Sequence, residues 1–203
     1  MTNSQTFLVV SDIHGALSGA KAMEEAFSYH HADKILCLGD VLYHGPRNNL
    51  PSDYAPKEVI TIMNAFKDNI IAVRGNCDAE VDQMVLNFPI TADYNILFHG
   101  AHQIFMSHGH VYGPNNLPTL SAGDSFLSGH THIPTAYEKD GILLLTPDPS
   151  LYQKKTTQEH MPLSMKMASP FIRLTINNTC IQIGFKSCII EKRKLRVNHV
   201  YTT

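Results

Sequence analysis

The chain has 203 residues, a length that suits one domain with a hydrophobic core and argues against two full domains. Hydrophobic residues make up 43% and charged residues 17%, the composition of a folded globular protein rather than a disordered one. The net charge of −2 excludes a strongly basic protein, so we expect no specific nucleic-acid binding and no attraction to anionic membranes.

The cysteines and the N-terminal sequence give indications of the cellular compartment of the protein. The four cysteines, Cys37, Cys77, Cys180 and Cys188, form no C-x-x-C pair and no regular framework, which indicates reduced thiols. Residues 1–10 contain no basic region followed by an apolar stretch, so we expect no signal peptide. No run approaches the roughly 18 apolar residues that a membrane span needs. We therefore expect a cytoplasmic protein.

Strand-like and helix-like segments alternate in the first half of the chain. Residues 7–10 form a short, wholly apolar run, which is typical of a strand buried on both faces. After Gly15, apolar residues recur at helical spacing, and Pro56 marks the start of a second such pattern. The predicted strands are 7–10, 34–38 and 70–73, and the predicted helices are 17–27, a segment from Pro56, and 79–88.

The pattern changes to successive strands in the second half. Apolar runs near 96–98, 102–106, 125–127 and 141–145 predict strands with no helices between them. Helix-connected strands followed by hairpins favour a mixed α/β fold, with two sheets packed together and helices outside.

Five polar clusters each follow one of the apolar runs. They read S-D-I-H-G from Ser11, G-D from Gly39, G-N-C-D from Gly75, S-H-G-H from Ser107 and G-H-T-H from Gly129. Asp, His and Asn supply the oxygen and imidazole donors that divalent first-row metals prefer. Each cluster alone is explained equally well by turn or capping roles. Because ligands bind beyond the carboxyl ends of strands in open α/β sheets, the five together predict one metal site.

The spacing within the clusters allows two ions to be bound side by side. Asp12 and His14 lie two residues apart, so both can face one ion from an extended loop, and His130 and His132 share that spacing. One ion would take Asp12, His14 and one histidine of the pair, and Asp40 is the natural bridging carboxylate. The second ion would be completed by Asn76, His108 and the other histidine of the pair.

Such a pair of cations has a recognised chemistry. Two ions about 3.5–4 Å apart can clamp both oxygens of an in-line phosphoryl displacement and lower the pKa of a bridging water. The sequence therefore predicts hydrolysis of a phosphate ester by a metal-activated hydroxide.

The ordered set D-x-H, G-D, G-N-[HC]-D, H-G-H and G-H-T-H resembles the calcineurin-like metallophosphoesterase superfamily. The run G-D-V-L-Y-H-G-P-R-N from Gly39, together with G-N-C-D, narrows the resemblance to the YfcE-type phosphodiesterases. The resemblance covers about residues 7–145. It implies a four-layer α/β/β/α sandwich of two mixed sheets and hydrolysis of small phosphodiesters by a dinuclear metal centre.

The resemblance also implies an assignment of the ligands. Manganese is the first choice of metal, with zinc, iron, nickel and cobalt as alternatives, and a homo-oligomer is left open. The first ion would be held by Asp12, His14, Asp40 and His132, and the second by Asp40, Asn76, His108 and His130.

Five further roles can be weighed against plainer ones. Asn76 would also stabilise the transition-state charge. His44 would protonate the leaving group or bind phosphate, unless it is an ordinary loop histidine. Arg47 would grip a phosphate oxygen bidentately, unless it forms a plain surface ion pair. Cys77 stands where many family members have a histidine, although a small buried filler is its commoner role. We expect Asp78 to cap the following helix rather than touch metal.

The chain departs from the family after the last core strand. Family members continue with N-P-G-S, whereas this chain reads T-P-D-P from Thr146. Codons built from the third base of one residue's codon and the first two bases of the next can encode N-P-G-S here. Further on, the same shift must turn Met165-Lys166 into Glu and Met167-Ala168 into Gly, giving E-[DN]-G, a plausible hairpin turn.

We therefore hypothesise a single-base frameshift near Leu145. Residues 1–145 would form the metallophosphoesterase domain, and residues 146–203 a divergent tail of the same domain. We expect that tail to be irregular and to leave the second sheet incomplete. A genuinely divergent tail is the alternative.

Two other functions compete with a dinuclear phosphodiesterase. One is a binding scaffold, because a retromer subunit of this family keeps the fold while losing ligands. The other is an inactive frameshifted product. A binding scaffold would be expected to have lost metal ligands, whereas an enzyme would keep them. All seven candidate ligands are present here.

Overall fold

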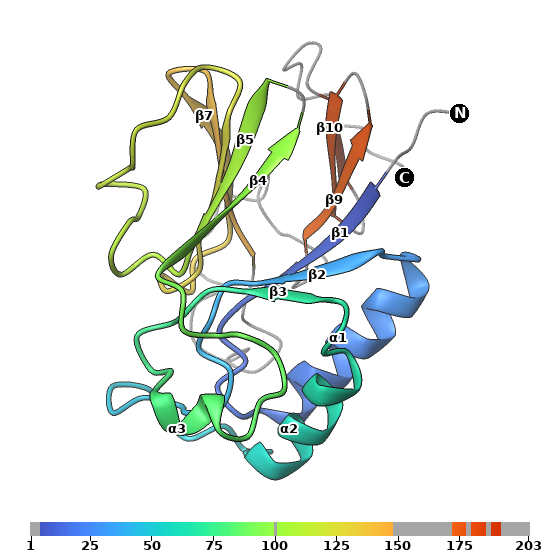
Figure 1. The fold of residues 1–203 in the computed structure, drawn as a ribbon, viewed down its shortest axis with the longest axis vertical. Coiled ribbons are helices and arrows are strands. Elements are labelled where there is room, and N and C mark those ends of the chain that lie inside the picture. The colour runs from blue at the N-terminus through green and yellow to red at the C-terminus, as the bar shows by residue number, and fades with distance from the viewer. Residues whose placement is uncertain (1–4, 100, 148–171, 178–179, 186–187, 192–203) are drawn as a thin grey trace, which may run out of the picture.

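A computed structural model of the protein describes residues 5–99, 101–147, 172–177, 180–185 and 188–191. Two sheets pack against each other, and helices cover the outer face of the first (Figure 1). The predicted mixed α/β fold with two sheets is confirmed. No helix in these described ranges is long and apolar enough to cross a membrane.

Parallel strands joined by helices form the N-terminal part of the first sheet. Strand β1 (Gln5–Val10) pairs with β2 (Lys34–Cys37), and β2 pairs with β3 (Ile70–Ala72). Helix α1 (Leu17–Tyr29) connects the first pair, and α2 (Pro56–Ala65) connects the second. Proline occupies the first turn of α2, where its missing N–H costs no hydrogen bond.

Both faces of β1 and β2 are buried, as their continuous apolar sequence predicts. Leu8 and Val10 face the helices, in the same core cluster as Met23 and Met63. The alternate residue Val9 packs toward the second sheet, in a cluster with residues of the second sheet. The strand ends are therefore held rigidly from two sides, which fixes the loops that follow them.

The second sheet is built from hairpins and short crossovers. Its strands are β4 (Tyr94–His99), β5 (His102–Ser107), β6 (Ser125–Leu127), β7 (Thr135–Lys139) and β8 (Ile142–Thr146), in the order β4-β5-β6-β8-β7. Tyr112, Leu117 and Leu120 pack on its outer face against Phe105 and Phe126. Within the described residues, irregular chain rather than a helix forms this outer layer.

The C-terminal strands correct the prediction of an irregular tail. Strand β9 (Ile172–Asn177) pairs antiparallel with β1, and β10 (Cys180–Phe185) and β11 (Cys188–Glu191) follow in the same sheet (Figure 1). They therefore extend the first sheet and not the second. Thr146 lies inside β8 and is buried, so regular structure continues past Leu145. Residues 148–171, which carry most of the broken family motif, lie outside the described residues.

Two predicted elements need smaller corrections. The helix expected over 79–88 is only α3 (Glu80–Gln83), and the chain continues from it as turns. Strand β7 was not predicted, because its sequence T-A-Y-E-K has no apolar run. It is an edge strand with three exposed residues, so the alternation that marks half-buried strands is weak there.

Candidate metal centre

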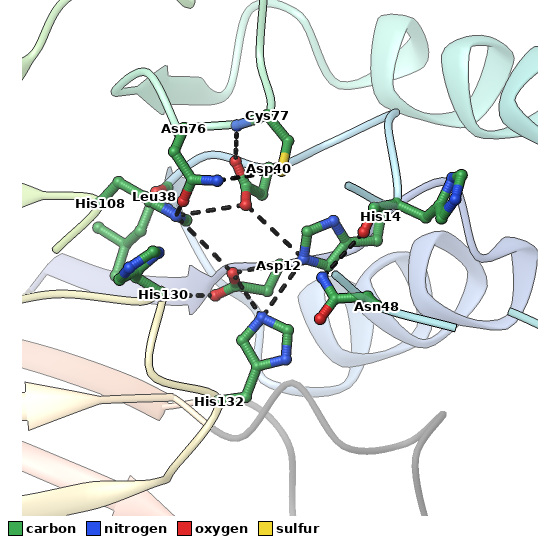
Figure 2. A network of polar contacts seen from close by, with 12 residues as sticks. Asp12, His14, Leu38, Asp40, Asn48, Asn76, Cys77, His108, His130 and His132 are labelled. Carbon is green, nitrogen blue, oxygen red and sulfur yellow. Dashed lines mark hydrogen bonds and ion pairs between the residues drawn. The ribbon is translucent and has the colours of Figure 1, made fainter. Parts of the chain in front are cut away.

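The five predicted clusters converge at one end of the two sheets. They follow β1, β2 and β3, which run parallel to one another in the first sheet, and β5 and β6, which run parallel in the second, so the carboxyl ends meet within each sheet. Figure 2 shows the candidate ligands gathered around the Asp12 and Asp40 carboxylates. Backbone hydrogen bonds tie the loops together: Asp12 N–H donates to the carbonyl of Gly39 at 3.0 Å and His14 N–H to that of Asp40 at 2.9 Å.

Most candidate ligands have a backbone conformation that side chains disfavour. Among the residues that the structure describes, seven non-glycine residues have positive φ, and five of them are candidate ligands: Asp12 (55°), His14 (50°), Asp40 (56°), His130 (66°) and His132 (55°). Such residues cost about 1–3 kcal/mol each and cluster at functional sites. The left-handed conformation lets a single residue turn its side chain out of the sheet and toward the shared centre.

The first group of donors surrounds one oxygen of Asp12. The Asp12 Oδ1 atom lies 3.1 Å from His132 Nε2, 3.6 Å from His14 Nε2 and 3.9 Å from His108 Nε2. The two nitrogens Nε2 of His14 and His132 are 3.4 Å apart. His132 therefore lies with Asp12 and His14.

A second group forms around Asp40 and His108. Nε2 of His108 lies 3.3 Å from Asp40 Oδ2 and 3.0 Å from Asn76 Oδ1. The same oxygen of Asp40 lies 3.7 Å from His14 Nε2, so it faces both groups. His130 lies on this side too, with its ring centroid 5.1 Å from that of His108.

Hydrogen bonds to backbone carbonyls fix the orientation of two histidine rings. His14 Nδ1 lies 2.7 Å from the carbonyl of Tyr43, and His108 Nδ1 lies 2.8 Å from that of Leu38. Because a carbonyl can only accept, Nδ1 must carry the proton in each ring. In the neutral imidazole, the Nε2 lone pair then faces the centre, as metal-ligating histidines require.

The electrostatics keep the two carboxylates charged. Burial alone would raise the pKa of Asp12 and Asp40, but the neighbouring imidazoles outweigh it and lower both pKa values below 3.8. Burial would lower the pKa of His108, yet Asp40 and Asp12 raise it to about 9. Burial and the nearby Asp40 raise the pKa of Cys77 to about 12, so its thiol stays neutral.

Two glycines leave room for the carboxylates. A Cβ at Gly75 would collide with Asp40 Oδ1, and one at Gly129 would collide with Ser11 Oγ and lie 2.6 Å from Asp12 Oδ2. The backbone N–H of Cys77 donates to Asp40 Oδ1 at 2.8 Å, and that of His130 donates to Asp12 Oδ2 at 3.0 Å. Each carboxylate therefore uses one oxygen for the backbone and presents the other to the centre.

Asp78 corrects another prediction, because it does not cap the helix that follows. Its carboxylate accepts hydrogen bonds from the backbone N–H of Asp40 (2.8 Å), Val41 (2.9 Å) and Gly75 (2.7 Å). It is only 8% exposed, and it joins the loops after β2 and β3. The bond to the residue three positions earlier is a local turn pattern that the G-N-C-D cluster could have suggested.

A cavity of about 550 Å³ opens beside these residues. Four candidate ligands form part of its wall, and residues 45–48, Cys77 and Thr131 form the rest. Arg47 lies at the cavity. His44 does not line it: its ring packs edge-on against Tyr43 and Tyr54, with centroids 4.8 and 5.5 Å away.

The donor set fits divalent cations. Asp12 Oδ1 is buried and makes no hydrogen bond within the described residues, although three imidazole nitrogens face it. The distances from Asp12 Oδ1 to His14 and His132, and from Asp40 Oδ2 to His14 and His108, are 3.1–3.7 Å, which matches ligands held on one ion by bonds of about 2.0–2.2 Å. Among the described residues, three triads could hold a metal ion: Asp12–His14–His132, Asp12–Asp40–His108 and His14–Asp40–Cys77.

Comparisons with known proteins identify the family of this chain. The calcineurin-like phosphoesterase superfamily domain matches residues 6–163. The phosphodiesterase YfcE of Escherichia coli strain K12 is 46% identical over 140 residues, which cover 69% of this chain and 76% of that protein.

The fold matches solved structures over most of the chain. The structure of YfcE, a phosphoesterase from Escherichia coli, aligns with a TM-score of 0.75 and 36% identity, covering 92% of this chain and 97% of that one. The longer alignment has the lower identity, so the added residues contribute few identities. Vacuolar protein sorting 29 from Cryptosporidium parvum shares the fold, with a TM-score of 0.58, 18% identity, and 93% and 97% of the two chains covered. The chain belongs to the calcineurin-like phosphoesterase superfamily.

Proposed function

We propose that the protein is a phosphodiesterase that uses two divalent metal ions, manganese before zinc, iron, nickel or cobalt, on small substrates in the cytoplasm. The observation that carries the proposal is the buried Asp12 Oδ1, which makes no hydrogen bond within the described residues and is faced by imidazole nitrogens. The first ion would be held by Asp12, His14, Asp40 and His132, and the second by Asp40, Asn76, His108 and His130.

Different residues of the chain would have different roles in hydrolysis. Bound ions would supply charge stabilisation and a water of lowered pKa. Asp40 would be the carboxylate shared by the two ions, because its Oδ2 faces both His14 and His108. The Asn76 side chain contacts His108 through Oδ1, while its Nδ2 lies 3.1 Å from Cys77 Sγ at the cavity wall. That amide can donate to an oxygen of the phosphate.

The overall reaction consumes one water. Its oxygen bonds to phosphorus, the P–O bond to one alcohol breaks, and the departing alcohol takes up a proton from the water. We assign no step to His44, because its ring packs between Tyr43 and Tyr54 instead of lining the cavity.

A reconstitution experiment tests the proposal. The purified protein would be stripped of metal, reloaded with each candidate ion, and assayed with bis-p-nitrophenyl phosphate and p-nitrophenyl phosphate. We expect two manganese ions per chain by elemental analysis and faster turnover of the diester than of the monoester. Undiminished turnover by the metal-free protein, or no turnover of either ester with any ion, would contradict the proposal.

A further inference from the structure

Arg47 supplies a positive charge at the cavity that the proposed metal centre does not require. Of the residues that line the cavity within the described ranges, Asp40 and Arg47 are the only Asp, Glu, Lys or Arg. No carboxylate of the described residues lies within 4.0 Å of the Arg47 guanidinium, whereas Arg74 pairs with Asp93 at 2.5 Å.

The turn that carries Arg47 is held in place by its neighbours. Asn48 Nδ2 donates to the carbonyl of His44 at 2.8 Å and closes the turn on itself. Gly45 is buried at φ +77°, and a Cβ there would lie 2.9 Å from Cys77 Sγ. The loop that leads into this turn also contacts a candidate ligand, because His14 Nδ1 lies 2.7 Å from the carbonyl of Tyr43. Arg47 is therefore presented at the cavity by a fixed backbone.

A count of the charges at the site indicates that Arg47 has a role apart from that of the metal centre. Two divalent ions would bring four positive charges, and Asp12 and Asp40 carry two negative ones. A phosphodiester and a hydroxide nucleophile account for the two that are left over. The Asp78 carboxylate is turned to the backbone N–H groups of Asp40, Val41 and Gly75 and does not line the cavity, so on the cavity side Arg47 adds a positive charge that a simple diester does not neutralise.

The walls also limit the kind of group that Arg47 meets. Within the described residues, the cavity lining includes no Phe, Tyr or Trp on which a nucleobase could stack. The residues that are not candidate ligands are small or polar: Gly45, Pro46, Asn48, Cys77 and Thr131. The volume of about 550 Å³ suits a small molecule. A short aliphatic arm with an anionic end fits these features.

We infer that Arg47 is a specificity-determining residue that selects phosphodiesters in which one alcohol arm carries a second negative charge, as a carboxylate or a phosphate. The inference rests on the proposed phosphodiesterase function, and it names the substrate class of that site. The guanidinium forms a charge-assisted hydrogen bond to the anion on the arm, while the metal centre receives the scissile phosphate.

Three diesters with one leaving group test the inference. Butyl, 3-carbamoylpropyl and 3-carboxypropyl p-nitrophenyl phosphate release the same p-nitrophenolate and differ only in the retained arm. In the manganese-loaded wild type we expect kcat/KM for the carboxylate arm to exceed that for the amide arm by about tenfold. In Arg47→Gln the ratio should fall to about one, and in Arg47→Lys it should be intermediate. Lys139→Gln, which removes the same charge from exposed strand β7, should keep the wild-type ratio.

Binding provides a second readout that does not need turnover. Phosphonate analogues with the same arms, titrated calorimetrically, should show the same preference in wild type and lose it in Arg47→Gln. A ratio that survives in Arg47→Gln overturns the inference, and so does an equal loss of kcat/KM on all three esters. The equal loss would place Arg47 on the scissile phosphate and leave the phosphodiesterase function standing. No hydrolysis of any of the three would instead refute that function.

Discussion

The body of the protein, residues 5–147, and its three C-terminal strands are specified by the sequence in different ways. The body holds all seven candidate ligands, five of them at positive φ, with several donors less than 4 Å apart. The C-terminal strands add to the β1 edge of the first sheet through backbone pairing. A strand addition needs alternating side chains and free edge groups, which many sequences provide. A metal centre needs particular residues at particular φ angles.

The identity to YfcE depends on how much of the chain is aligned. It is 46% over 140 residues and 36% when the alignment covers 92% of the chain. The residues added by the longer alignment therefore contribute few identities. The predictions below test how far site and tail are independent.

Replacing the shared carboxylate should have the largest effect. Asp40→Asn keeps the shape of the side chain, and asparagine tolerates the φ of 56° that Asp40 adopts. It removes a negative charge that faces both donor groups, so we expect kcat to fall at least about a thousandfold. The loss should exceed that of His132→Ala, measured on the same diester. Near-normal turnover with two bound ions would contradict the bridging role.

Removing metal should abolish activity and lower the stability of residues 5–147 more than that of strands β9–β11. Dialysis against a chelator should abolish hydrolysis, and manganese should restore it, because the donors are oxygens and imidazoles. Manganese at about 100 times its Kd should stabilise the fold by about 2.7 kcal/mol, which raises the Tm by several degrees. Hydrogen exchange should show the protection gained at the ligand loops and not at β9–β11. Equal gains in both regions would show that they are coupled.

Asp78 should matter for the centre without touching it. Asp78→Asn places an amide N–H₂ among three backbone N–H groups that now donate to a carboxylate. We expect the Kd for manganese to rise about 10- to 100-fold, as for other residues that orient metal ligands. Asp82→Asn is the matched control, since its carboxylate accepts only the exposed N–H of Ala79 in the described residues. If both variants bind manganese equally well, Asp78 has no positioning role.

Correcting the inferred reading frame should have the smallest effect on the site. If the tail is out of frame, a chain with N-P-G-S after β8 should have a higher soluble yield and a Tm raised by a few degrees. Its manganese affinity should change little, since every candidate ligand precedes Thr146. Sequencing of the coding DNA provides the direct check. A gene with no alternative frame for N-P-G-S, or no gain in Tm, would favour genuine divergence.

The sequence predicted the site better than it predicted the tail. Convergence of the clusters followed from one rule, that neighbouring parallel strands present their carboxyl ends together, and β1, β2 and β3 obey it. Strand β9 was missed although I-R-L-T-I-N alternates apolar and polar residues over 172–177, because the broken motif upstream suggested a disrupted tail. That alternation weighs against an out-of-frame origin for the three strands.

Other features could not be predicted from sequence alone. Nothing in the letters D-I-H or T-H gives the positive φ of Asp12, His14 and His132, which depends on the packing of the loops around them. The packing of His44 between Tyr43 and Tyr54 depends on a loop whose sequence has no periodicity. The φ angles and the packing of His44 both depend on contacts between residues far apart in the sequence, and such contacts cannot be inferred from the spacing of residues along the chain.

The positive φ angles of the candidate ligands serve metal binding but lower the stability of the folded chain. A glycine at His130 or His132 would relax a backbone that now costs about 1–2 kcal/mol per residue, so the metal-free protein would become more stable as the ion lost a donor. Selection for thermal stability alone, without an activity screen, would therefore tend to erase this centre. A folded relative that has lost its ligands is the product that such selection would leave.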